Sequence, residues 1–140
     1  ETINVSIDVE PTGVPLTIVV MIDGDSVYEK LIEQRTTVGF DFQDTDGEHC
    51  LSIIMQGKQP EHTKVDSDGT IIADSLLHFS RFTIDDIDIS QTLLDKSVYR
   101  HDFNGHGPET SQKFFGVMGC NGTVDFRFSG PFYIWLLENM

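Results

Sequence analysis

The sequence of 140 residues predicts an all-β protein, an antiparallel β-sandwich of jelly-roll-like type that spans residues 1–140 as a single domain. Three observations predict it. Apolar and polar side chains alternate along most of the chain, which is the period of a half-buried strand. Asp-Gly and Asn-Gly pairs separate these runs at short intervals and supply the positive φ angles of tight hairpins. No segment carries a sustained helical periodicity.

The first half of the chain is predicted to form four or more strands. Four apolar residues share one face of the first of them: Ile3, Val5, Ile7 and Val9. Residues 16–22 are apolar on both faces, which is typical of a central strand. Runs with strand character follow at residues 38–42, 51–55 and 71–77. Residues 28–35 are the best candidate for a local helix.

The second half continues the same pattern. Strand-like runs are predicted at residues 79–89, 98–103, 114–117 and 124–128. The chain then ends in the apolar run of residues 132–137, which would be an aggregation hazard on an exposed edge. We therefore expect this run to be a core strand that closes the sheet, with Trp135 inside the core.

The charge balance excludes two classes of partner. The chain carries 9 Lys and Arg against 23 Asp and Glu, so its formal net charge is −14. A general nucleic-acid binder needs a basic surface to neutralise phosphates, and anionic lipid also attracts basic proteins. The longest apolar run is far too short to span a bilayer. We expect no nucleic-acid or membrane partner, whereas basic protein surfaces would be attracted, with an association that weakens as salt rises.

Acidic turns are the candidate metal sites. Calcium takes about six to eight oxygen ligands, and turns that gather carboxylates beside backbone carbonyls can supply them. The candidate ligands are Asp44, Asp46, Asp66 and Asp68. None of these turns is an EF-hand, because a loop that starts at Asp44 or Asp66 reaches an apolar residue at its last ligand position. The alternative, that Asp-Gly pairs only build turns and their charges face water, stays open.

Catalytic motifs are absent, so the chain is predicted not to be an enzyme. It has no nucleophile elbow, no HExxH zinc motif and no phosphate-binding glycine loop. The five histidines are spread along the chain and are expected to make ordinary hydrogen bonds. Tyr28 and Tyr99 lie beside polar stretches and are the candidates for surface contact with a ligand such as a sugar, because exposed aromatic rings stack on sugar rings.

Two resemblances add to this interpretation. Residues 16–24 and 49–58 resemble the strand-and-turn pattern of small calcium-dependent carbohydrate-binding modules of the xylan-binding type. Residues 101–105, 115–124 and 135–140 resemble uncharacterised small proteins of marine tailed bacteriophages. The first resemblance implies calcium and a glycan as partners. The second implies a virion-associated β-sandwich, and neither implies a catalytic residue.

Three functions follow, in order of preference. The first is a non-enzymatic accessory or structural subunit of a phage particle that contacts other protein subunits through its surface. The second is a calcium-dependent carbohydrate-binding module, and the third is a small hydrolase that uses a carboxylate pair. The first two predict that the protein resides in a virion or outside the cell.

Overall fold

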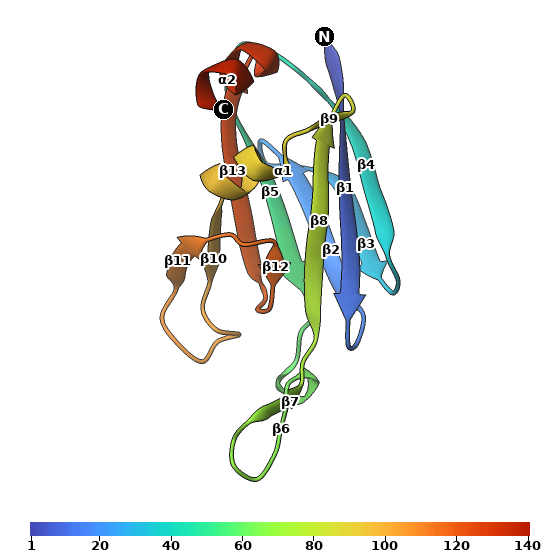
Figure 1. Ribbon diagram of the computed structural model, residues 1–140, viewed down its shortest axis with the longest axis vertical. Helices are drawn as coiled ribbons and strands as arrows, with labels where there is room; N and C mark the ends of the chain where they lie inside the picture. Colours follow the sequence, from blue (N-terminus) through green and yellow to red (C-terminus); the bar gives the residue numbers. More distant parts are fainter.

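A computed structural model describes residues 1–140 and confirms the predicted antiparallel β-sandwich (Figure 1). The strands of the first sheet are, in spatial order, β12 (Val117–Met118), β8 (Leu76–Ile84), β1 (Thr2–Thr12) and β4 (Thr36–Gln43), with β9 (Ile87–Asp88) paired to β8. Those of the second sheet are β11 (Thr110–Lys113), β10 (Val98–His101), β13 (Gly122–Gly130), β5 (Gly47–Gln56), β2 (Leu16–Ile22) and β3 (Asp25–Ile32). A small hairpin of β6 (Lys64–Val65) and β7 (Ile71–Ala73) projects from one end of the molecule (Figure 1).

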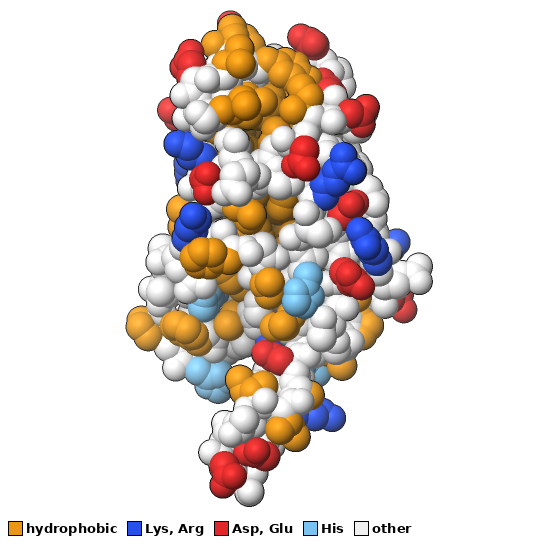
Figure 2. Space-filling view, viewed as in Figure 1, with side chains coloured by type: hydrophobic (Ala, Val, Ile, Leu, Met, Phe, Trp, Pro, Cys, Tyr) orange, Lys and Arg blue, Asp and Glu red, His pale blue; other side chains and the backbone are white.

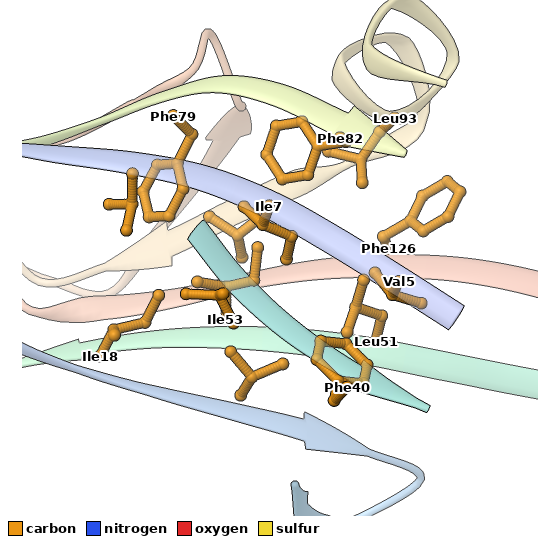
Figure 3. Packing of buried hydrophobic residues seen from close by; sticks show 14 of the residues in the cluster. Val5, Ile7, Ile18, Phe40, Leu51, Ile53, Phe79, Phe82, Leu93 and Phe126 are labelled. Carbon is orange, nitrogen blue, oxygen red and sulfur yellow. The ribbon is translucent and has the colours of Figure 1, made fainter. Parts of the chain in front are cut away.

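The core lies between the two sheets, where the alternating apolar residues meet. Figure 3 shows side chains from β1, β4 and β8 directed toward those from β2, β5 and β13. The alternation predicted for β1 is confirmed, because its four apolar residues are each at most 2% exposed: Ile3, Val5, Ile7 and Val9. The prediction that residues 16–22 form a central strand is also confirmed, since β2 pairs with both β3 and β5.

The turn between β2 and β3 is the tight hairpin that its Asp-Gly pair predicts. Asp23 has a φ of 50° and Gly24 a φ of 86°, the left-handed conformation that two-residue hairpin turns require. Asp23 is fixed against β5, because its N–H donates to the Cys50 carbonyl at 3.0 Å and its Oδ1 accepts the Cys50 N–H at 2.8 Å. The turn therefore holds the Asp23 carboxylate at the end of the second sheet.

Two short α-helices and one 3₁₀ turn complete the chain. They are α1 (Ser90–Lys96), α2 (Phe132–Asn139) and η1 (Pro60–His62). None of the helices combines the length and the apolar character that crossing a membrane would need. The helix candidate at residues 28–35 instead lies mostly in β3, where Leu31 and Glu29 pair with Thr17 and Val19 of β2.

The expectation that residues 132–137 form a core strand is wrong, because they form α2. Pro131 precedes the helix with its φ near −66°, and the Asp44 carboxylate accepts the Phe132 N–H at 3.1 Å. A carboxylate at this position satisfies a free N–H and favours a helix start. Phe132 and Leu136, one helical turn apart, are then buried together.

The end of β13 lies against the loop between β4 and β5. A Cβ atom at Gly130 would overlap the carbonyl oxygen of Thr45, so this close approach requires glycine. The approach brings Asp44 and Thr45 to the start of α2 and to the first residues of β5. One end of the sandwich therefore combines the β2–β3 turn, the β4–β5 loop and α2 (Figure 1).

Candidate functional site

A hollow of about 380 Å³ opens at this end of the second sheet. It is lined by residues from the β2–β3 turn, β5, β13 and α2: Asp23, Glu48, His49, Cys50, Arg127, Phe128, Ser129 and Trp135. In the register of β5 and β13, Glu48 is opposite Ser129 and Cys50 is opposite Arg127. Glu48 and Arg127 are exposed, and Ser129 and Trp135 are half-buried. The hollow thus presents two carboxylates, a guanidinium and a hydroxyl beside an aromatic ring.

His49 is a buried residue in the lining of the hollow, and both nitrogens of its ring make hydrogen bonds. Its Nδ1 lies 2.7 Å from Asp23 Oδ2, and its Nε2 lies 2.7 Å from the carbonyl oxygen of Thr45. Both partners can only accept hydrogen bonds, so both nitrogens must donate. The geometry therefore fits the protonated imidazolium form, which links the β2–β3 turn to the β4–β5 loop through β5.

The pKa values of this pair shift in opposite directions. Burial lowers the pKa of His49, but hydrogen bonds to Asp23 and to the Thr45 carbonyl, with the charges of Asp23 and Asp44, raise it above 6.5 overall. Burial raises the pKa of Asp23, but hydrogen bonds from His49 and from the Cys50 N–H bring it below 3.8 overall. Each group favours the charged form of the other.

The stability that this pair contributes should depend on pH. Because the pKa of His49 is raised on folding, its contribution is fully present below pH 6.5 and is lost as pH rises through the raised pKa. Because the pKa of Asp23 is lowered, its contribution is present above pH 3.8 and is lost as pH falls through the lowered pKa. We therefore expect the wild type to be more stable than His49→Gln. The difference between their free energies of unfolding in urea, which we call the stability gap, should become smaller as pH rises above 6.5.

His106→Gln is the matched control for that measurement, because His106 is exposed. We expect this surface replacement to change the free energy of unfolding by less than about 0.5 kcal/mol. A gap for His49→Gln that does not change with pH would contradict the charged pair.

The candidate metal ligands occupy opposite ends of the molecule. Asp44 and Asp46 lie in the β4–β5 loop beside α2, whereas Asp66 and Asp68 lie in the β6–β7 turn (Figure 1). Asp44 accepts the Phe132 N–H, and Asp66 Oδ1 accepts the N–H groups of Asp68 and Thr70 at 2.9 and 3.0 Å. No group of three or more His, Cys, Asp or Glu side chains comes together in a way that could hold a metal ion. Because calcium also takes backbone carbonyl and water oxygens, binding at these four aspartates stays a prediction.

The two candidate ligand-contact tyrosines differ in exposure. Tyr28 is half-buried at the edge strand β3, packed against the core, so its role in binding stays a prediction. The expected exposure of Tyr99 is wrong, because this side chain is only 3% exposed. Its hydroxyl accepts the Cys120 N–H at 2.9 Å and donates to the Cys120 carbonyl, and burial raises its pKa to about 12. Tyr99 thus anchors the segment before β13.

Sequence reasoning missed the residues that shape the hollow, above all His49, Arg127 and Trp135. Trp135 does pack on the core, with its ring centroid 5.5 Å from that of Phe126, but it also forms a wall of the hollow. The alternation of β13 was the usable signal. With Phe126 and Phe128 buried, Arg127 must face outward, and its partner across the sheet must face outward with it.

Comparisons with known proteins agree with the fold. The sequence matches no protein-family model and no curated protein. The structure is similar to vCBM60 solved in complex with galactobiose, with a TM-score of 0.53 and 10% identity over 88% of this chain and 96% of that one. It is also similar to the selenomethionine form of vCBM60, with a TM-score of 0.52 and 11% identity over 89% of both chains.

The second of these structures is described in connection with a circular permutation that links two families of calcium-dependent carbohydrate-binding modules. At such low identity the likeness establishes the architecture alone. The chain therefore has the antiparallel sandwich fold found in these carbohydrate-binding modules.

Proposed function

We propose that this protein is a non-catalytic module that binds an oligosaccharide in the hollow between β5, β13 and α2. The observation that carries the proposal is the lining of this hollow, which combines the Trp135 ring with the charged groups of Arg127 and Glu48. An aromatic ring can pack against the C–H face of a sugar, while carboxylate and guanidinium groups bond to its hydroxyls. The similarity in fold to vCBM60 supports the same proposal.

The charges around the hollow favour a neutral sugar. Asp23 already binds His49 and the Cys50 N–H, so it offers only its remaining lone pairs. Glu48 is an acceptor and Arg127 a donor, and together they match hydroxyls that can both donate and accept. An acidic sugar would bring its own charge toward Asp23 and Glu48 in a chain of net charge −14.

Titration calorimetry with galactobiose, after a survey of neutral oligosaccharides on a glycan array, tests this proposal. We expect Arg127→Gln to weaken the binding of a retained sugar by about tenfold or more, because a charge-assisted hydrogen bond is lost. Arg81→Gln is the matched control, since Arg81 lines a separate polar hollow on the first sheet. Retention of no glycan, or loss of binding in Arg81→Gln alone, would contradict the proposal.

Calcium is tested in the same titration. Because the candidate carboxylates do not converge, we expect the affinity to be unchanged when a chelator is added. Loss of binding on chelation would show that a cation takes part, as the resemblance to calcium-dependent modules implies.

The other predicted functions have less support. The two similar solved structures are described as carbohydrate-binding modules, so a virion-associated role and a virion or extracellular location stay predictions. A carboxylate hydrolase needs one acid with a raised pKa to donate a proton. The pKa of Asp23 in the hollow is lowered instead, which suits an acceptor of hydrogen bonds.

A further inference from the structure

Helix α2 is apolar on its outer side as well as its inner side. Phe132 and Leu136 face the core and are buried. On the other side, Ile134, Leu137 and Met140 are 56%, 77% and 83% exposed, and we call these three residues the α2 stripe. Ile134 and Leu137 are three residues apart and lie on one side of the helix, and Met140 is the residue that follows the last helical residue, Asn139. A helix that is apolar all round is usually covered on both sides.

The stripe belongs to a continuous apolar patch. Figure 2 shows hydrophobic side chains gathered at the end of the molecule where Figure 1 places α2, with acidic side chains at the border. Single exposed apolar residues are common on soluble proteins, whereas contiguous patches mark interaction sites. The position of this patch at the end of the sandwich leaves it accessible to another protein.

The border of the patch is acidic. The Tyr133 hydroxyl donates to Asp85 at 2.5 Å. Burial, this hydrogen bond and the charges of Asp85, Glu1 and Asp44 raise the pKa of Tyr133 to about 12. Asp44 also lies at the start of α2, where its carboxylate accepts the Phe132 N–H. Glu138 is exposed on α2 itself, and the helix contains no Lys or Arg. Asp44, Asp85 and Glu138 thus lie on or beside α2, and the helix has no basic group to balance them.

We propose that the α2 stripe is the docking surface for a protein segment whose apolar side chains are flanked by lysine or arginine. The apolar side chains would cover Leu137 and its neighbours, and the basic groups would meet the carboxylates at the border. Such charge complementarity guides association and fixes orientation. A second copy of this chain is a poorer occupant, because two identical acidic borders would repel each other.

The experiment uses the whole protein and a fluorescein-labelled synthetic peptide of leucine and lysine at helical spacing. Leu137→Glu replaces the central side chain of the α2 stripe, which is 77% exposed, without touching the core. Ile72→Glu is its matched control, because Ile72 is 65% exposed in the hairpin at the opposite end and the charge change is the same. We expect Leu137→Glu to weaken binding about tenfold or more and Ile72→Glu to change it less than twofold.

Equal losses in the two variants would mean that the peptide senses only net charge, which would overturn the proposal. A concentration-dependent dimer in sedimentation that Leu137→Glu abolishes would overturn it in favour of a second copy. The border is tested by Glu138→Gln, which should weaken peptide binding and its salt dependence more than Glu33→Gln in the distant β3–β4 loop. Equal effects of these two variants would contradict the role of the border.

This inference is independent of sugar binding. Leu137 does not line the hollow, so Leu137→Glu should leave the affinity for a retained glycan unchanged while peptide binding falls. If no glycan binds, the peptide experiment still tests the α2 stripe. If no peptide binds, the glycan experiment still tests the hollow.

Discussion

Replacing Lys58 with alanine should lower the free energy of unfolding by about 3–5 kcal/mol, the cost of breaking a buried ion pair. The Lys58 side chain is only 2% exposed, and its Nζ lies 2.6 Å from both Asp74 Oδ1 and the Gly119 carbonyl oxygen. Burial raises the pKa of Asp74, but hydrogen bonds from Lys58, Thr63 and Ser75 bring it below its usual range overall. Alanine would leave this carboxylate and the Gly119 carbonyl without their ammonium donor.

The matched control is Lys113→Ala. Lys113 pairs with Asp95 at 3.5 Å, but both side chains are half exposed, so the loss should be about 0–1 kcal/mol. Urea unfolding at neutral pH measures both changes. The double variant Lys58→Met with Asp74→Asn should recover part of the loss, because no uncompensated charge is then buried. Similar small changes in Lys58→Ala and Lys113→Ala would show that the Lys58 pair contributes little.

Phe132→Ala should also cost about 3–5 kcal/mol, because it opens a cavity beneath α2. The Phe132 ring is fully buried, with its centroid 5.6 Å from that of Phe128 and 6.0 Å from that of Trp135. Since Trp135 forms a wall of the hollow, the same variant should also weaken glycan binding. Thermal unfolding and calorimetry measure the two effects.

Leu137→Ala on the same helix is the control, because Leu137 is 77% exposed and its truncation should change stability by less than about 0.5 kcal/mol. If Phe132→Ala lowered the free energy of unfolding as little as Leu137→Ala, this would contradict the packing of α2 against the sandwich.

The period-two pattern was sufficient to predict the sandwich, because a strand that is buried on one face alternates apolar and polar residues in the sequence. β1, β4 and β13 all show it. The terminal run could not be assigned in this way, since it is apolar without interruption and such a run is compatible with a strand or a short helix. The helix start is instead supported by the Asp44 carboxylate, which accepts the Phe132 N–H and lies 88 positions away in the sequence.

The hollow was also hard to predict, because contacts between residues far apart in the sequence form it. Its residues come from four separated segments, and they meet only when β5 pairs with both β2 and β13. The contact between His49 and Asp23 spans 26 residues, and neither residue type alone marks a site. Tyr99 shows the converse, because polar neighbours in the sequence suggested exposure while the register of β10 turned its ring inward.

The most direct test of sugar binding in the hollow uses Trp135, which is the only tryptophan of the chain. Its indole N–H gives a single nuclear magnetic resonance signal, so any change in that signal reports on one wall of the hollow. During titration with an oligosaccharide retained on the array, this signal should shift until it saturates. The midpoint of the shift should agree with the dissociation constant measured by calorimetry. A sugar that binds with the same affinity while the Trp135 signal stays in place would contradict the account.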